Sequence, residues 1–210
     1  MFKSLIRTTI FIYTFVKFGV ITCAFTTLVA CRGTSYEDAL LERMEDGERL
    51  AYRVDAMTDS GPLVVDNTTG SASFSGVAEL IAGPETNGAL LFGDAFVRVN
   101  FDDQSNVYGS ISDIGGLGNV DFNDEASGNI DRYSGTITLS DGSVGSGNQL
   151  EVDYIGTLRG NGDTIVFDGN MTGLFSEEFD IEAVTLGSIE DASYNGIYYE
   201  SLVAIVAEWN

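Results

Sequence analysis

The stretch from Leu150 to Phe175 constrains the fold more than any other part of the chain. Apolar and polar residues alternate along it on both sides of Asn161-Gly162. Asn-Gly favours a type I′ hairpin turn, because both central residues of that turn need a positive φ. Since side chains alternate sides with a period of two, a turn there predicts one apolar face. The expected pairs on this face are Leu158 with Ile165, Gly156 with Phe167, Tyr154 with Gly169, and Val152 with Met171.

The same alternation recurs through residues 71–209, and no helical pattern interrupts it. The sequence therefore predicts an all-β fold, an antiparallel up-and-down barrel of about eight strands. An open sandwich is the alternative. The expected strands are residues 71–81, 89–101, 107–111, 131–141, 150–160, 163–175, 179–189 and 196–208.

Glycine is abundant where the barrel is expected. The chain holds 25 glycines and only 2 prolines, which suits strands joined by tight turns. Glycines on an inner face would allow the sharp coiling of a narrow barrel. Residues 115–129 are expected to form a glycine-rich excursion, with Val120–Phe122 as a short extra strand or a plug. The glycines expected on the inner face are Gly76, Gly93, Gly109, Gly135, Gly156, Gly169 and Gly187.

The first 30 residues have the form of a secretory leader, with basic residues near the start and an apolar run up to Ala30. Leu28-Val29-Ala30-Cys31 resembles the lipobox of bacterial lipoproteins, which implies cleavage between Ala30 and Cys31 and acyl chains on Cys31. The alternative is an uncleaved membrane helix over residues 8–30. In that helix, Lys17 would lie near the bilayer centre at a cost of about 2.5–3.5 kcal/mol.

Residues 31–70 are expected to tether the barrel domain, residues 71–210, to the lipid. Ser35-Tyr36-Glu37-Asp38 has the form of a capping box and predicts a short amphipathic helix that ends near Gly47. Its charged residues suit a solvated face. Its apolar residues could instead dock on the barrel or on a partner; these are Leu40, Leu41 and Met44.

Charge excludes several functions. The first 30 residues hold three of the ten basic residues and none of the 32 acidic ones, so the rest of the chain carries a net charge of −25. Such a surface repels nucleic acid and anionic headgroups. Mid-strand charges on the expected outer face, such as Arg98, Glu151 and Asp168, argue against a barrel that spans a membrane.

The residue types and their spacing give little support for a catalytic site or a metal site. The chain has no histidine, which excludes histidine-based triads and histidine-ligated zinc or haem. Asp121, Asp124 and Glu125 could gather a calcium ion, but their spacing fits no EF-hand, and a solvated acidic loop is the simpler interpretation. We therefore expect no enzyme, no cofactor and no resident metal.

The C-terminal segment carries a family resemblance. Gly196, Tyr198 and Tyr199 match the closing signature of the transferrin-binding protein B-like β-barrel domain. The chain departs from that signature where Glu200 and Ser201 replace Gly-Pro, Ile205 replaces a glutamate and Glu208 replaces a glycine. Upstream segments are similar to that family's strands, namely Val97–Phe101, Val107–Ile111, Tyr133–Gly135 and Asp168–Phe175.

The resemblance implies a lipid-anchored, non-catalytic binding module at the outer membrane, on its periplasmic side or at the cell surface. The resemblance is not taken to imply that this chain binds transferrin, because transferrin binding needs a second lobe and partner-specific loops. A protein or small molecule would bind at the barrel loops, where the candidate contact residues are Tyr108, Phe122, Tyr194 and Tyr199. A structural envelope lipoprotein without a specific ligand is the alternative, and it predicts that these rings are buried.

Overall fold

The structure is a computed structural model that describes residues 35–59, 70–102, 106–123, 128–145, 149–178 and 181–209. The expected leader, its cleavage site and Cys31 lie outside the described residues. Within the described ranges, one helix precedes nine strands. The elements are α2 (Ser35–Asp59), β1 (Ser71–Ala82), β2 (Gly88–Asn100), β3 (Val107–Val120), β4 (Asn129–Arg132), β5 (Ile137–Val144), β6 (Gln149–Gly160), β7 (Asp163–Glu178), β8 (Ile181–Tyr194) and β9 (Ile197–Trp209).

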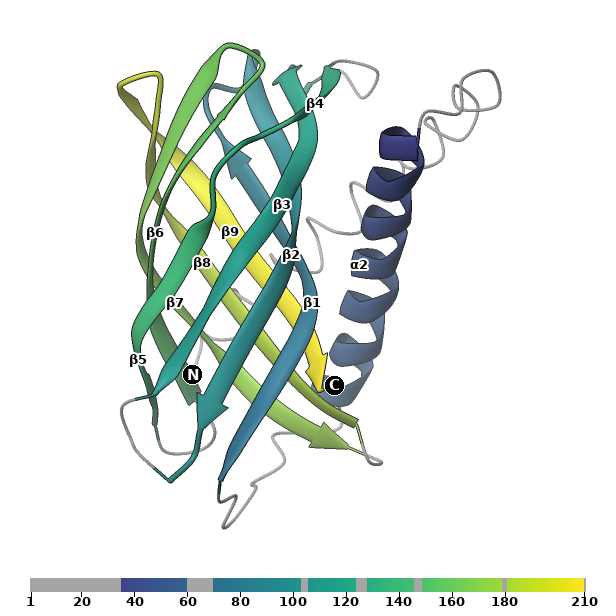
Figure 1. The fold of residues 1–210 in the computed structure, drawn as a ribbon, viewed down its shortest axis with the longest axis vertical. Helices are drawn as coiled ribbons and strands as arrows, with labels where there is room; N and C mark the ends of the chain where they lie inside the picture. Colours follow the sequence, from purple (N-terminus) through teal and green to yellow (C-terminus); the bar gives the residue numbers. More distant parts are fainter. Residues whose placement is uncertain are drawn as a thin grey trace.

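The strands form one closed antiparallel barrel (Figure 1). They follow the order β2-β1-β9-β8-β7-β6-β5-β3-β4, and a further pairing of β2 with β3 closes the ring. β4 and β5 pair with different parts of the same strand, β3, so together they fill one of eight positions around the barrel. The predicted all-β antiparallel barrel is confirmed.

The hairpin of β6 and β7 has the expected register. All four predicted pairs are present, from Leu158 with Ile165 to Val152 with Met171. The turn residues Asn161 and Gly162 have φ values of 54° and 83°, the positive values that a type I′ turn needs. The local pattern therefore fixed both the turn and the face of each side chain.

The barrel interior is an apolar core to which every strand except β4 contributes. Phe74 and Phe175 meet edge to face with their ring centroids 5.8 Å apart, and the ring of Phe101 lies tilted against Phe175 with the centroids 5.2 Å apart. The largest fully buried side chains include Phe167, Leu80, Leu91, Ile111 and Met171. Packing of this kind supplies most of the free energy that holds the strands together.

The helix is longer than the sequence indicates. α2 spans 25 residues, so the prediction that it ends near Gly47 is wrong. A glycine inside a helix costs only about 1 kcal/mol. Gly47 is buried on the same helical stripe as Leu40, Met44 and Leu50, and this stripe packs against the barrel. Tertiary packing therefore outweighs the weak local signal to stop.

Two glycine assignments also differ from expectation. Gly115–Val120 continues β3 rather than forming an excursion or a plug. Gly116 pairs with Leu91, and a side chain at Gly116 would collide with the backbone oxygen of Leu90. Glycine there permits close strand approach rather than marking a loop. Gly187 is on the outer face, because it pairs with the outward residues Thr172 and Ala204.

Candidate functional site

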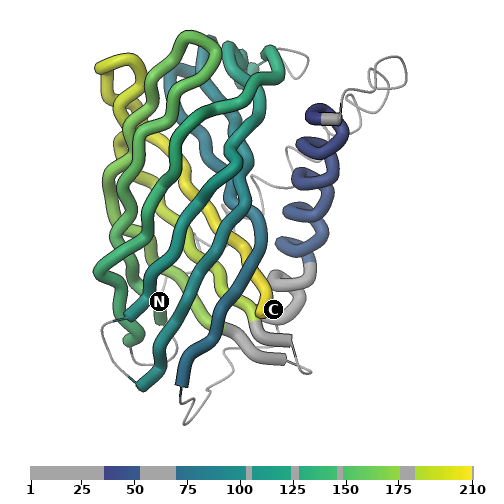
Figure 2. The backbone as a smooth tube through the Cα atoms, viewed as in Figure 1, coloured from purple at the N-terminus to yellow at the C-terminus, as the bar shows by residue number. Residues whose placement is uncertain are grey.

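The helix α2 covers one side of the barrel wall (Figure 1), and Figure 2 shows its backbone running beside the strands. Leu40 and Met44 are buried against outward residues of β1, β2 and β3, among them Val77, Leu90 and Leu117. Further along the helix, a second cluster joins Leu50 with Ala183 and Val206. α2 is therefore docked along the wall, as one of the two interpretations of its apolar residues predicts.

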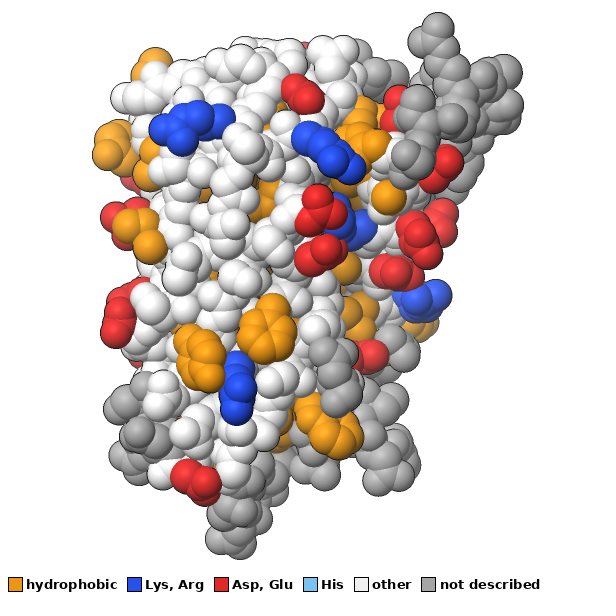
Figure 3. Space-filling view, in the orientation of Figure 1, with side chains coloured by type: hydrophobic (Ala, Val, Ile, Leu, Met, Phe, Trp, Pro, Cys, Tyr) orange, Lys and Arg blue, Asp and Glu red, His pale blue; other side chains and the backbone are white. Residues whose placement is uncertain are grey.

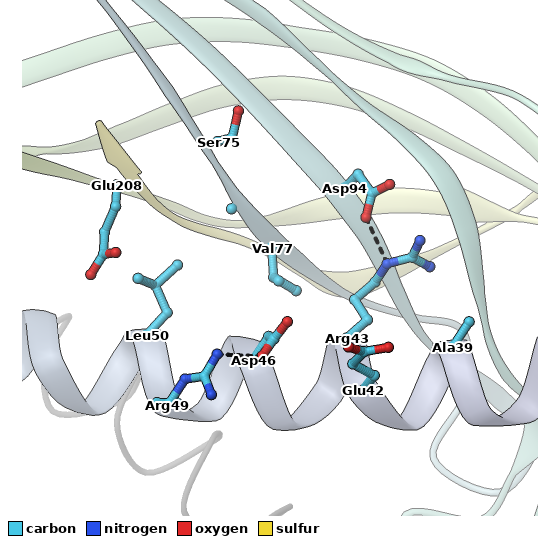
Figure 4. A pocket seen from close by; sticks show the side chains of 11 residues that line it. Ala39, Glu42, Arg43, Asp46, Arg49, Leu50, Ser75, Val77, Asp94 and Glu208 are labelled. Carbon is cyan, nitrogen blue, oxygen red and sulfur yellow. Dashed lines mark hydrogen bonds and ion pairs between the residues drawn. The ribbon is translucent and has the colours of Figure 1, made fainter. Parts of the chain in front are cut away.

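A single arginine ties the middle of α2 to β2 and β3. Arg43 Nε donates to Asp94 Oδ1 at 2.8 Å (Figure 4). Arg43 Nη2 donates to Asp113 Oδ2 at 2.7 Å. Its Nη1 also donates to the backbone oxygen of Asp113 at 2.9 Å. Only 11% of the Arg43 side chain is exposed. Burial lowers the pKa of this guanidinium, but its hydrogen bonds to Asp113 and Asp94 raise the pKa by more.

The N-terminus of α2 is held separately. Tyr36 Oη donates to the backbone oxygen of Asp131 at 3.0 Å, and the Arg132 guanidinium lies 4.1 Å from the centre of the Tyr36 ring. Gly115 has no side chain, which leaves room for the Tyr36 hydroxyl against β3. These contacts fix the start of the helix beside β4.

A carboxylic acid is buried under the helix. Glu79 lies on the outer face of β1 between Val77 and Ile81, both of which belong to the cluster that α2 covers. Only 1% of Glu79 is exposed, and neither carboxyl oxygen has a hydrogen-bond partner among the described residues. Burial raises the pKa of Glu79 to about 8, so the carboxyl is mostly protonated at neutral pH.

Between α2 and the wall lies an open groove of about 400 Å³ (Figure 4). Its carboxylates come from the helix and from the wall, and include Glu42, Asp46 and Asp94. Its two arginines already have partners, since Arg43 holds Asp94 and Arg49 holds Asp46 at 2.6 Å. Within the described residues, the groove therefore offers no uncommitted cation to an anionic ligand.

A polar cluster closes the barrel at the end that carries the Asn161-Gly162 turn. Asp163 accepts hydrogen bonds from Tyr194 Oη at 2.6 Å and from Asn195 Nδ2 at 2.8 Å. The hydroxyl of Tyr133 is buried nearby without a hydrogen-bond partner. Burial raises the pKa of Tyr133, and the Asp163 carboxylate raises it further. Burial, followed by the bond to Asp163, likewise raises the pKa of Tyr194. The network pins the β8–β9 turn to β7.

The four aromatic residues proposed as ligand contacts do not meet. Tyr108 is 41% exposed on the outer wall. Phe122 is half-buried against the cluster under α2, whereas Tyr199 is half-buried against the barrel core. Tyr194 is buried in the polar cluster. Tyr108 is therefore the member of the set that offers the most ring surface to a partner.

Tyr108 has two neighbours that sequence reasoning missed. Arg98 is its cross-strand partner, and Phe96 lies two residues earlier on the same outer face of β2. We call Phe96, Arg98 and Tyr108 the aromatic patch. Phe96 is 39% exposed, and Figure 3 shows two hydrophobic side chains flanking a basic one on this face. The sequence carried one signal for this patch: Phe96 is an aromatic residue at an outward position of β2, and its neighbours on that face, Asp94 and Arg98, are polar.

Arg98 is the charged member of the aromatic patch. Its Nη2 lies 3.3 Å from Ser71 Oγ, and it makes no ion pair with a carboxylate among the described residues. The guanidinium thus remains available on a chain of strongly negative net charge. Arginine and tyrosine are also enriched among the residues that dominate binding energies at protein interfaces.

The acidic loop gains no support as a cation site. Asp124 and Glu125 lie outside the described residues. Asp121 Oδ1 accepts a hydrogen bond from the backbone nitrogen of Asn123 at 2.9 Å. Across the described part of the chain, no group of three or more acidic or cysteine side chains could hold a metal ion.

Comparisons with known proteins give no relative. No family model, no curated protein and no solved structure matches the chain. The described part of the chain contains no helix long and apolar enough to cross a membrane. Function is therefore argued from the residues and their geometry.

Proposed function

We propose that this chain is a lipid-anchored, non-catalytic binding module of the bacterial outer membrane, attached through Cys31 and exposed to the periplasm or to the cell surface. The observation that carries the binding role is the aromatic patch. It combines two half-exposed rings with a guanidinium that has no carboxylate partner among the described residues. The resemblance to the transferrin-binding protein B-like barrel supports the same class of function.

The chemistry of the patch indicates the kind of partner. Flat rings bind apolar or aromatic surface with little loss of side-chain entropy. Arg98 favours a carboxylate beside that surface, because a guanidinium can donate two parallel hydrogen bonds to it. The partner we propose is a protein that presents an aromatic or aliphatic side chain next to an aspartate, a glutamate or a C-terminus.

The anchor is tested by mass and fractionation. The protein is expressed with its own leader beside Cys31→Ser. We expect a diacyl or triacyl mass on a chain that begins at Cys31, recovery with the outer membrane, and release by the substitution. An uncleaved and unacylated chain would contradict the proposal and favour the membrane-helix alternative for residues 8–30.

The binding role is tested by photo-crosslinking in cells that make the protein naturally. A photoreactive amino acid at Tyr108 should give a discrete adduct that Arg98→Ser abolishes. The matched control is the same amino acid at Ile189, which is 47% exposed on the outer face of β8, three strands around the barrel from β2 and four from β3. No adduct at Tyr108, or equal adducts at both positions, would favour the structural lipoprotein without a ligand.

A further inference from the structure

We infer that the barrel stands on the membrane with one particular end toward the lipid. This inference rests on the proposed anchor at Cys31. We call the two ends the turn end and the loop end. The turn end carries the β1–β2, β6–β7 and β8–β9 turns, at residues 83–87, 161–162 and 195–196. The loop end carries the start of β1 and the end of β9, where Phe74 pairs with Trp209.

The helix α2 sets this orientation because its N-terminus lies at the turn end (Figure 1). Leu40, near the start of α2, packs with Leu117 and Val120 at the end of β3. Leu50, further along, packs with Ala183 and Val206, which are close to the loop end. The helix therefore runs from the turn end toward the loop end, antiparallel to β3.

The link between Cys31 and α2 is short. Four residue steps separate Cys31 from Ser35, and a fully extended chain covers about 14 Å in that number of steps. Tyr36 is in turn fixed to the backbone oxygen of Asp131. Acyl chains on Cys31 would consequently hold the turn end within about 14 Å of the headgroups. The loop end would lie about a barrel length further out.

An independent feature of the turn end fits a lipid surface. Ile197 and Tyr198 follow the β8–β9 turn, and they are 59% and 72% exposed. Tyrosine is enriched where protein meets the headgroup region, since its ring is apolar and its hydroxyl is polar. Exposed apolar side chains at this tip gain from contact with the interface.

The orientation has a consequence for the aromatic patch. Arg98 lies near the end of β2 and Tyr108 near the start of β3, so the patch belongs to the half of the barrel toward the loop end. With the turn end on the membrane, the patch faces away from the lipid. A partner in the periplasm or outside the cell could then reach it without displacing the bilayer.

Energy transfer to labelled headgroups tests the orientation. The protein is produced with its leader and inserted into phosphatidylcholine vesicles that contain a headgroup-linked acceptor dye. A donor is attached either at Thr86→Cys in the turn end or at Asp102→Cys in the loop end, both exposed positions. Strands tilted by about 40° separate the ends by roughly 30 Å, so we expect transfer to be about twofold higher from position 86.

Two further variants test the role of the docked helix. Arg43→Glu, combined with Leu40→Glu and Leu50→Glu, removes the ion pairs of α2 with Asp94 and Asp113 together with its apolar contacts with the wall, so α2 should detach and the difference between the two donor positions should vanish. Arg49→Glu is the matched control, because Arg49 is 70% exposed and bonds only within the helix, to Asp46. Circular dichroism verifies that the barrel of each variant is folded.

The outcomes separate the two proposals. An acylated, vesicle-bound protein with equal or reversed transfer overturns the orientation and leaves the anchor intact. If energy transfer stays higher from position 86 than from position 102 after the three combined substitutions have detached α2, the helix does not set the orientation. A protein without acyl mass that fails to float with the vesicles overturns the anchor and the orientation together.

Discussion

Glu79 lies at a position whose neighbours are apolar and where an apolar side chain would be expected. Val77 and Ile81 flank it on the outer face of β1, and Phe92 and Ala204 are its partners on the adjacent strands. Its carboxyl has no hydrogen-bond partner among the described residues and is fully covered. An ionised carboxylate in such surroundings is strongly unfavourable, so the group keeps its proton or the helix above it moves.

Protonation of Glu79 makes stability depend on pH. The pKa of the folded chain is about 8, against 4.5 for a free glutamate. Below pH 4.5 both states hold the proton, and this residue adds no pH dependence. Between 4.5 and 8 the unfolded chain releases the proton first, so the free energy of unfolding falls by about 1.4 kcal/mol per pH unit. Above pH 8 the loss is complete.

We expect Glu79→Gln to remove this slope. Urea unfolding at pH 5, 6, 7 and 8 measures it, and the difference from the wild-type chain isolates Glu79 from the other carboxyls. Glu79→Met should raise the free energy of unfolding at pH 8, because a buried carboxylate gives way to apolar packing. Parallel curves for the wild-type chain and Glu79→Gln would show that Glu79 ionises freely in the folded protein.

The limits of sequence reasoning are visible at single residues. The pairs around Asn161-Gly162 could be predicted because alternation and turn chemistry act within one hairpin. Glu79 could not, because an outward position is typical of a solvated residue, whereas this one lies beside the cluster that α2 covers and is buried. Phe96 and Arg98 were missed as neighbours of Tyr108 for a related reason: their contact depends on the pairing of β2 with β3.

Among the elements, α2 was the one whose extent the sequence misjudged. Ser35, where the sequence predicts a capping box, is the first described residue of α2. The continuation of α2 past Gly47 depends on contacts with the barrel, and no window of the sequence contains both partners. The same limit applies to Arg43. The sequence predicts it on the solvated face of the helix, but it bridges Asp94 and Asp113.

Arg43 should contribute more to stability than its exposed neighbour. Arg43→Ala removes three hydrogen bonds and is expected to lower the free energy of unfolding by about 1–2 kcal/mol. Arg49→Ala removes a surface ion pair within the helix and should change it by less than about 0.5 kcal/mol. Chemical unfolding of both variants at the same pH makes the comparison. Equal losses of unfolding free energy in the two variants would contradict a stabilising role for the bridge from Arg43 to Asp94 and Asp113.

At the scale of the whole molecule, the last strand, β9, closes the barrel. β9 pairs with β8 from Ile197 to Glu208 and with β1 from Leu202 to Trp209. It also contributes Val203, Ile205 and Ala207 to the core. The eight positions around the barrel and their antiparallel order follow from the sequence, since each strand is joined to the next by a short connection. The single strand expected over residues 131–141 is wrong, because this part of the chain forms two strands, β4 and β5. The closing pairs, β1 with β9 and β2 with β3, complete the ring.

Removing β9 should therefore unfold the barrel as a unit. A chain truncated after Tyr194 leaves β1 and β8 with unpaired edges and exposes the inner face of both strands. We expect it to lose the cooperative thermal transition that the full chain shows by near-ultraviolet circular dichroism. Ile197→Ser, which changes an exposed side chain of the same strand, should keep that transition within a few degrees. A truncated chain that melts like the intact one would show that closure by β9 is not what holds the barrel together.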